Sequence, residues 1–427
     1  MKKNSICILI LFAIFSLPNV AYAEAELNKG DTAWLLISTA LVLFMTLPGL
    51  ALFYGGLVRK ENVLSILIQC FVIACVASVV WFVYGYSLAF KGDGAWLGNL
   101  EGLFLAHLTR ESLYNQIPET VWIMFQMTFA IITPALVIGA FAERMKFISV
   151  ILFTILWLTL VYVPVAHWVW GGGWLSKLGT LDYAGGLVVH LTCGIGALVS
   201  ALMIGNRNSF PQTAPPHNRT MVFTGAAMLW VGWFGFNAGS AVSANQDAGM
   251  AMLVTHLSAS VGALTWLTID WIKSGKPTII GIATGMVAGL ATITPASGYV
   301  GPAGSILIGL FAGVVCYFAT DLIKNKWQLD DSLDVFPVHG VGGLLGSIMV
   351  AGLISTSWGG IGFSNDHTMG SQLWVQLQAI AVILVWTLSF TFIILKLINV
   401  TVGLRVKTES EAQGLDVADH DEQGYII

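Results

Sequence analysis

Long apolar stretches separated by short polar connections run along almost the whole chain. A helix that crosses a bilayer needs about 20 mainly apolar residues. Eleven stretches reach this length, and the hydropathy pattern predicts a transmembrane helix over each of them. They cover residues 33–54, 62–90, 118–142, 147–170, 183–205, 220–240, 248–272, 278–296, 303–323, 335–355 and 372–399.

The composition agrees with this pattern. The chain is 56% hydrophobic and only 10% charged, whereas a soluble domain carries about 25% charged residues. The net charge is −4 and no basic cluster is present, so we expect no nucleic-acid partner. The sequence therefore favours an all-α polytopic membrane protein.

The first residues have the features of a secretory signal. Lys2 and Lys3 precede a short apolar run, and the small residues "AYA" follow at 21–23. We expect a cleaved signal peptide over residues 1–23, a membrane domain over 24–400 and a polar tail over 401–427. An uncleaved extra helix is the alternative, although the apolar run is short for a span.

The distribution of positive charge predicts the orientation. Seventeen Lys and Arg residues remain after removal of the signal peptide, and 13 of them fall on one predicted side. The positive-inside rule places that side in the cytoplasm, so the mature N-terminus lies outside and the C-terminus inside. The 13 residues are Arg59, Lys60, Arg144, Lys146, Arg207, Arg219, Lys273, Lys276, Lys324, Lys326, Lys396, Arg405 and Lys407.

The eleven spans divide into two sets of five and a final helix. A set with an odd number of spans makes the second set enter the membrane from the opposite face, as in inverted-repeat transporters. Asp182 and His190 open the fifth span, and Asp334 and His339 open the tenth. We therefore expect the two histidines to approach the midplane from opposite sides and to meet.

Ionisable residues within a bilayer are costly and usually face a pore or cavity. Glycines flank His190 and His339, which allows the helices to approach closely. The alternative is that each histidine is a hydrogen-bonded packing residue. His256 lacks both the acid and the glycines, so we interpret it as structural, at a subunit contact.

Cysteines give little information about a metal or a cofactor. Cys193 lies three residues after His190, on the same face of a helix, a spacing that is open to metal binding. A structural zinc ion takes four ligands, however, and no further ligands are evident. We therefore expect no metal, no cofactor and no enzymatic activity, and an intramembrane metalloenzyme is the alternative that metal analysis would test.

Two stretches place aromatic and small residues at one face of the membrane. They are "VAHWVWGGG" (165–173) and "WFGFNAGSA" (233–241). An interfacial aromatic belt would have the same composition. The functional alternative is a site for a small cation, which an indole face attracts and a hydroxyl oxygen can bind.

Eight motifs together resemble the bacterial ammonium transporter (Amt/Mep/Rh) family. They are "PGLALFYGGLVRKENVLS", "FAER", "HWVWGGG", "DYAGGLVVH", "GWFGFNAGSA", "ATITPASGY", "DVFPVHGVGG" and "VGLRVKTESEAQGLDVADH". The resemblance extends from about residue 31 to the tail. It implies a homotrimer of eleven-span protomers in the bacterial inner membrane, each with its own pore for ammonium, ammonia and methylammonium.

The resemblance also implies residue roles. Trp170, Phe129 and Ser240 would recruit ammonium, Phe129 and Phe236 would form the gate, and Asp182 would support the recruitment site. His190 and His339 would be the twin histidines of the pore, with Trp233, Thr294 and Thr284 near it. Thr284 departs from the family pattern, which has Ser there, but keeps the hydroxyl group.

The tail and the partners follow from the same resemblance. Residues 401–427 are polar enough to be disordered alone, but "GLRV" and "GLDV" supply two apolar anchors. The family implies a tail that packs on the cytoplasmic face and helps to bind a PII-class (GlnK-type) regulator. A sensor that acts through such a docked partner is the alternative to a transporter, and a solvated terminus is the alternative for the tail.

Overall fold

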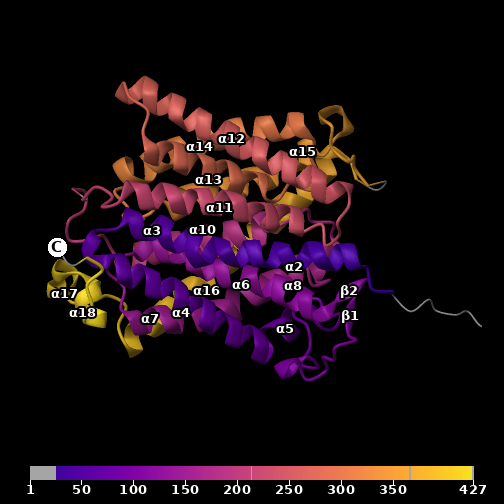
Figure 1. Cartoon of the computed structure of the whole chain (residues 1–427), viewed down its shortest axis with the longest axis horizontal. Coiled ribbons are helices and arrows are strands. Elements are labelled where there is room, and N and C mark those ends of the chain that lie inside the picture. The colour runs from indigo at the N-terminus through magenta and orange to yellow at the C-terminus, as the bar shows by residue number, and fades with distance from the viewer. Residues whose placement is uncertain (1–25, 213, 365–366, 426–427) are drawn as a thin grey trace, which may run out of the picture.

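The computed structural model describes residues 26–212, 214–364 and 367–425, so the predicted signal peptide lies outside the described residues. Helices dominate these ranges and lie side by side along one direction of the molecule (Figure 1). In the described chain, ten helical segments are long and apolar enough to cross a membrane, and the shorter apolar helix over Ile279–Ile293 adds an eleventh. The predicted eleven-span all-α fold is confirmed.

The first five spans are built mostly from helical pieces joined end to end. Short π-helical turns join or precede the pieces: η1 (Met45–Leu50), η3 (Trp81–Gly85), η5 (Leu158–Tyr162) and η6 (Gly186–Leu191). The α-helices are α2 (Lys29–Phe44), α3 (Ala51–Leu57), α4 (Val63–Val80), α5 (Tyr86–Phe90), α6 (Glu119–Phe141), α7 (Phe147–Trp157), α8 (Val163–Val169), α9 (Trp174–Lys177) and α10 (Thr192–Ile204).

Each of the other six spans contains one α-helix. These helices are α11 (Arg219–Gly239), α12 (Gln246–Ser274), α13 (Ile279–Ile293), α14 (Pro302–Asp321), α15 (Val341–Leu353) and α16 (Met369–Thr401), with the π-helical turns η7 (Leu322–Lys326) and η8 (Phe336–Gly340). The short strands β1 (Leu113–Tyr114) and β2 (Ile117–Pro118) form an antiparallel hairpin, and the tail contains α17 (Thr408–Gln413) and α18 (Leu415–His420).

Side-chain caps fix the starts of several spans. The side chains of Asn28, Asn218 and Asn245 accept hydrogen bonds from backbone N–H groups in the first turns of α2, α11 and α12. Thr278 caps α13 in the same way, and Thr368 forms a capping box at the start of α16. These short polar side chains satisfy N–H groups that have no partner within the helix.

The two halves of the bundle pack on each other reciprocally. The turn η6 packs against α15, and the equivalent turn η8 of the second half packs against α10. The described chain begins at the end that carries the β1–β2 hairpin and finishes at the opposite end, beside α17 and α18 (Figure 1). We call these two ends the hairpin face and the tail face.

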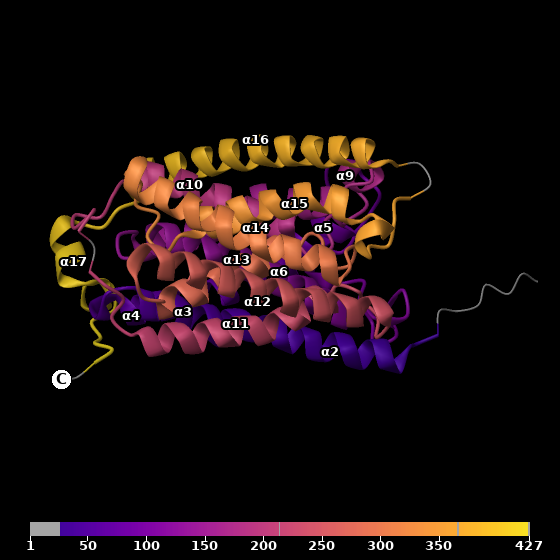
Figure 2. The ribbon, with the colours of Figure 1, turned by 90° about the horizontal axis from the view of Figure 1, so that it is seen from above.

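Large apolar side chains are exposed along the outer helices. The helix α16 follows one edge of the bundle in Figure 2, and it exposes 62% of Val385 and 68% of Val400. Leu202 on α10 and Leu264 on α12 are exposed to a similar extent. Large exposed apolar side chains are stable in contact with lipid or with another subunit and not in contact with water. These helices therefore form the lipid-facing or subunit-facing sides of the bundle.

The tail packs on the tail face of the bundle. Leu404 of "GLRV" and Leu415 of "GLDV" are both buried, so each expected anchor contributes an apolar contact. The Asp416 carboxylate accepts hydrogen bonds from the backbone N–H groups of Leu64 (3.1 Å) and Ser65 (2.8 Å), and thereby caps α4 from a distance in sequence. The solvated alternative is therefore wrong for the segment from Leu404 to Asp416, whereas residues 421–424 are exposed.

Candidate functional site

The two histidines of the repeated motifs meet at the centre of the bundle. His190 lies in η6 and His339 in η8, and their Nδ1 atoms are 3.2 Å apart. The ring centroids are 5.2 Å apart with an interplanar angle of 23°. Because both side chains are buried, the pair forms a polar contact inside an apolar interior.

Glycines allow this contact. A Cβ atom on Gly343 would come within 2.6 Å of the Gly186 carbonyl oxygen and 2.9 Å of the His190 Cβ atom. A Cβ atom on Gly194 would overlap the backbone of Gly340. The two helices that carry the histidines therefore cross at a distance that only glycine permits.

Each histidine helix has a buried carboxylate at its start. Asp182 accepts hydrogen bonds from four consecutive N–H groups, those of residues 185–188, at 2.6–3.0 Å. At the equivalent turn of the second half, the acceptor is Asp331, which binds the Phe336 N–H at 2.7 Å. The sequence interpretation that Asp334 is the counterpart of Asp182 is wrong, because Asp334 forms an ion pair with Lys324 at 2.7 Å.

Burial affects both capping acids in the same direction. Burial raises the pKa of Asp182 to about 6, against the opposite effect of its four backbone hydrogen bonds. Burial, together with the negative charge of Asp334, raises the pKa of Asp331 to about 7. Hydrogen bonds to an ionised carboxylate favour the charged form, so the elevation of both pKa values is due to the removal of these groups from water.

A narrow apolar bore surrounds the histidine pair. His190 stacks on Trp233 and Phe236, with ring centroids 5.4 and 6.0 Å apart. The Trp233 indole N–H donates to Thr294 Oγ1 at 2.9 Å, which fixes the ring. Of the twelve residues that line the bore, His190 and His339 are the only ones that carry an ionisable group: Met45, Leu50, Phe53, Ile132, Leu136, Val189, His190, Leu229, Trp233, Phe236, Val287 and His339.

A cavity of about 230 Å³ opens at the hairpin face, and we call it the mouth. Trp170, Phe129 and Ser240 all line the mouth, so the structure brings together the three residues expected to recruit the substrate. The rings of Phe129 and Phe236 lie 4.4 Å apart between the mouth and the bore. The full lining is Trp122, Phe125, Gln126, Phe129, Val169, Trp170, Tyr183, Ser240 and Val242.

Hydrogen bonds orient the polar groups of the mouth. The Trp170 indole N–H donates to the Asp182 carbonyl oxygen at 2.8 Å. The Ser240 hydroxyl donates to the Phe236 carbonyl oxygen at 2.9 Å, so the lone pairs of Oγ are available to a donor in the cavity. The mouth thus offers aromatic faces and hydroxyl oxygens, a combination that suits a small cation carrying N–H groups.

A cavity of about 410 Å³ opens at the tail face, and we call it the inner cavity. His339 lines both the inner cavity and the bore, whereas His190 lines the bore and not the inner cavity. Thr284 lies in the wall of the inner cavity and donates its hydroxyl hydrogen to the Ile280 carbonyl oxygen. Asp330, Asp334, Arg207 and Lys324 supply charge to the same wall.

Among the mouth residues that the sequence did not predict, three carry polar side-chain atoms: Trp122, Gln126 and Tyr183. Trp122 and Tyr183 lie at the ends of predicted spans, where aromatic residues are common for interfacial reasons, so they carried no separate signal. Gln126 did carry one, because it is an amide in an otherwise apolar helix. Gln126 is buried, and its Oε1 atom has no hydrogen-bond partner in the described structure.

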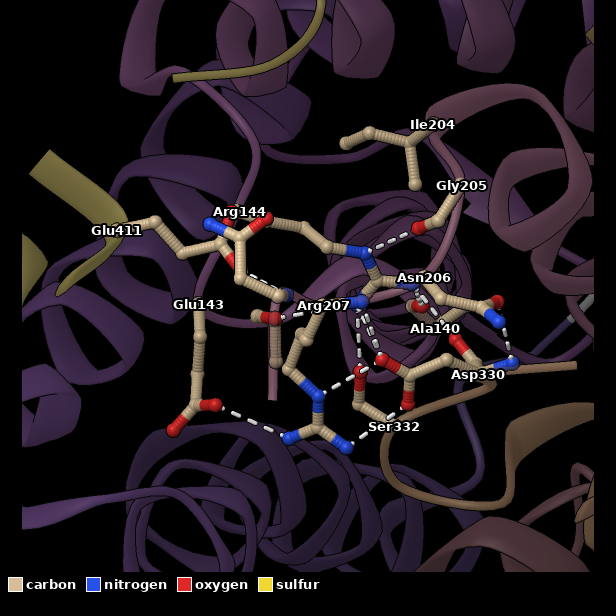
Figure 3. A network of polar contacts seen from close by, with 12 residues as sticks. Ala140, Glu143, Arg144, Ile204, Gly205, Asn206, Arg207, Asp330, Ser332 and Glu411 are labelled. Carbon is tan, nitrogen blue, oxygen red and sulfur yellow. Dashed lines mark hydrogen bonds and ion pairs between the residues drawn. The ribbon is translucent and has the colours of Figure 1, made fainter. Parts of the chain in front are cut away.

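A polar network underlies the tail face (Figure 3). The fully buried guanidinium group of Arg144 donates to Ser332 Oγ (2.6 Å) and to the carbonyl oxygens of Asp330 (2.6 Å) and Ala140 (2.9 Å). It also donates to the Gly205 carbonyl oxygen at 2.8 Å. The "FAER" motif therefore contains a structural arginine that joins three connections of the tail face.

A second arginine extends this network to the tail. Arg207 binds Asp330 at 2.8 Å and Glu143 at 3.0 Å. Although burial opposes it, the pKa of Asp330 is lowered by its hydrogen bonds and charge interaction with Arg207. Glu411 of the tail accepts from the Asn208 N–H at 2.7 Å and pairs with Arg405 at 2.7 Å, so the tail is joined to the connection before α11.

His256 is separate from these features. It is exposed on the surface of α12, where its ring packs against Trp230 and Phe234 at 5.1 and 6.2 Å. His256 therefore lies on the outer surface of the bundle and does not line the bore. The position agrees with the expected structural role, and the subunit contact remains a prediction.

The model of the Ammonium Transporter Family matches residues 33–425. The chain belongs to this family. Its function class is therefore that of a membrane transporter and not of an enzyme. The match includes both histidine helices, the mouth and the tail.

Individual members of the ammonium transporter family are similar over nearly their full length. The chain is 44% identical to an ammonium transporter of Aquifex aeolicus, with 98% of each chain covered. It resembles the crystal structure of Mep2 from Saccharomyces cerevisiae with a TM-score of 0.80 and 37% identity, covering 90% of this chain and 92% of that one. A sensor Amt protein gives a TM-score of 0.85 at 28% identity, with 92% and 98% covered.

Proposed function

We propose that this protein transports ammonium, and its analogue methylammonium, by recruiting the cation at the mouth and conducting ammonia through the bore. The faces of Trp170 and Phe129 attract the cation, and Ser240 accepts one of its N–H groups. Asp182 supports this site through the carbonyl oxygen that holds Trp170. The Phe129–Phe236 pair separates the mouth from the bore and acts as the gate.

Deprotonation follows from the energetics of the bore. A full charge moved without water through an apolar channel costs many kcal/mol, and neutral ammonia avoids most of that cost. The contact between His190 and His339 carries this proposal, because each imidazole can donate and accept a proton. The pair offers a separate path for the proton. Trp233, fixed by Thr294, forms part of the bore wall beside the pair, and Thr284 lines the inner cavity into which the bore opens.

We place the hairpin face outside the cell and the tail face in the cytoplasm of a bacterial inner membrane. Thirteen of the 17 Lys and Arg residues after the signal peptide support this orientation. We also propose a homotrimer with one pore in each protomer. The exposed apolar faces of the bundle support an assembly within the bilayer but do not specify its number of subunits.

We propose that the tail regulates transport and contributes to the binding of a cytoplasmic PII-class (GlnK-type) partner. Its hydrogen bonds to Leu64, Ser65 and Asn208 support this role, since they join residues 411–416 to the start of α4 and to the connection that carries Arg207 into the wall of the inner cavity. The likeness to a sensor Amt protein favours a second candidate, in which ammonium binding is reported to a docked partner.

Substitution of the histidines tests the transport mechanism. In liposomes, His190→Ala and His339→Ala should lower methylammonium uptake and the associated current by about 100-fold, because proton transfer loses its relay. His256→Ala is the matched control, since His256 lies on the outer surface of α12. An Asp variant of either pore histidine should stall or admit potassium, because a negative charge can hold a cation without deprotonating it.

Two results would decide against this mechanism. Wild-type current and selectivity in both alanine variants would make His190 and His339 packing residues. If the wild-type protein takes up no methylammonium but changes its affinity for a PII-class protein when ammonium is added, the sensor is the better description.

A further inference from the structure

A third potential ligand lies beside the histidine pair. The thiol of Cys193 and one nitrogen atom of each of His190 and His339 all lie within 4.8 Å of one another, and all three side chains are buried. Cys193 is the residue that follows one turn after His190, at the start of α10. Ammonium transport as proposed above assigns no task to this thiol.

The spacing of the two imidazoles fits one metal ion. Zinc binds histidine nitrogen at about 2.0–2.1 Å, so two nitrogen ligands in tetrahedral geometry lie about 3.3 Å apart. The Nδ1 atoms of His190 and His339 are 3.2 Å apart. A thiolate at a Zn–S distance of about 2.3 Å would lie about 3.6 Å from each nitrogen. The three potential ligand atoms now lie within 4.8 Å of one another, so a shift of the Cys193 side chain toward the histidines completes the set.

The protons of the site can be accounted for. In the present contact one Nδ1 atom donates to the other, so metal binding at both atoms requires that this hydrogen moves to Nε2 of the same ring. His190 Nε2 has no hydrogen-bond partner in the described structure and can carry it. Cys193 now donates its thiol hydrogen to the His190 carbonyl oxygen at 3.4 Å, and it would release that proton to solvent on binding.

Access to the cluster is from the tail face. His339 lines the inner cavity as well as the bore, and the carboxylates of Asp330 and Asp334 lie in the wall of that cavity. Arg207 and Lys324 line the same wall and pair with these two acids, so an entering cation meets paired charges before the nitrogen and sulfur ligands. A set of two imidazoles and one thiolate suits a borderline-soft ion such as Zn²⁺, and it leaves a fourth position for water or ammonia in the bore.

We propose that His190, Cys193 and His339 form an inhibitory binding site for a Zn²⁺-class transition-metal ion within the pore. A metal ion here occupies both histidine Nδ1 atoms and places a positive charge in the bore. It thereby removes the proton path and repels the cation at the mouth. The inhibition depends on the transport function proposed above, whereas the metal binding does not.

Binding is measured with Co²⁺, the spectroscopic substitute for zinc, added to the purified full-length protein. We expect a thiolate-to-cobalt absorption band and the visible bands of a tetrahedral ion, at one ion per protomer. Both signals should disappear in Cys193→Ala and in His339→Ala. Cys316→Ala is the matched control, because Cys316 is also buried and free but lies on α14, outside this cluster.

Inhibition is measured as methylammonium uptake into liposomes, with Zn²⁺ on both sides and a chelator to reverse its effect. Cys193→Ala should transport normally without zinc and should require at least about tenfold more zinc for half-inhibition, whereas Cys316→Ala should match the wild type. Cobalt spectra unchanged by Cys193→Ala would overturn the site. Equal zinc sensitivity in the two variants would overturn the inhibition. If the wild-type protein takes up no methylammonium, the proposed transport function is wrong. The metal site is still tested in that case, because the cobalt spectra do not depend on transport.

Discussion

The Trp170 ring is fixed at the mouth by a hydrogen bond from its indole N–H, which lies in the ring plane. The two faces of the ring therefore remain available for other contacts. Its indole N–H donates to the Asp182 carbonyl oxygen, and Asp182 is itself fixed by four backbone N–H groups. Phe129 meets the indole edge to face, with centroids 5.7 Å apart. The position of this one ring therefore depends on the capping acid of the fifth span, which explains how Asp182 can matter without reaching the mouth.

Replacement of this ring gives a prediction at the residue scale. Trp170→Leu removes a cation–π contact worth about 1–2 kcal/mol at a partly desolvated site, so the apparent affinity for methylammonium should fall about 5- to 30-fold. The concentration dependence of uptake measures this. Trp174→Leu is the control, because Trp174 packs against Trp96 and Trp168 and does not line the mouth. An unchanged concentration dependence in Trp170→Leu would make Trp170 an interfacial residue.

Single residues differed in how well the sequence revealed them. The pore histidines and Trp170 lie in motifs in which residue type and spacing are unusual for a membrane span. Asp331 was missed because three neighbouring acids precede η8, and only the folded backbone shows which carboxylate reaches the Phe336 N–H. The proximity of His339 to Cys193 was also beyond the sequence, since the two residues are 146 positions apart.

The sequence predicted the position and length of each membrane span, but it did not predict the local backbone conformation within the spans. Each predicted span overlaps an observed helical segment, and in most cases the ends agree within a few residues. This agreement is expected because a span must be apolar over the full thickness of the bilayer, and hydropathy detects that length directly. The sequence did not predict the π-helical turns such as η5 (Leu158–Tyr162) and η6 (Gly186–Leu191). These turns depend on which neighbour packs against the helix, and hydropathy carries no information about that.

The crossing of the two histidine helices gives a prediction at the element scale. Gly194→Ala adds a Cβ atom where Gly340 already lies, so the helices must separate. We expect a loss of about 1–3 kcal/mol in the free energy of unfolding and a large loss of uptake, as the His190–His339 contact opens. Thermal unfolding in detergent and liposome uptake measure the two effects.

A glycine in open surroundings is the control for this substitution. A Cβ atom on Gly249 of α12 meets nothing within 4 Å, so Gly249→Ala should leave uptake unchanged and stability equal or slightly higher. If Gly194→Ala behaves in the same way, the close crossing does not hold the histidines together.

At the scale of the whole molecule, the tail joins elements that are far apart in the chain. Asn62, at the start of α4, accepts from the Leu415 N–H at 2.7 Å, and the Arg59 guanidinium donates to the Glu411 carbonyl oxygen at 2.7 Å. The apolar letters of "GLRV" and "GLDV" correctly indicated anchoring. The surfaces that receive these anchors come from the "FAER" region and the start of α4, and no local pattern in the tail identifies them.

Release of the tail gives the last prediction. Asp416→Ala removes the carboxylate that caps α4 at Leu64 and Ser65, a contact worth about 1–2 kcal/mol. The tail should then exchange its backbone hydrogens faster and be cleaved more readily by protease, and the PII-class partner should bind more weakly. Deletion of residues 401–427 should abolish that binding or impair transport, because it also removes the Lys146 and Val406 backbone contacts that tie the tail to the end of α6 and the start of α7. Glu409→Ala is the control, since Glu409 lies exposed on the same segment. If the truncated protein transports and binds the partner as the full chain does, the tail stabilises the tail face without regulating it.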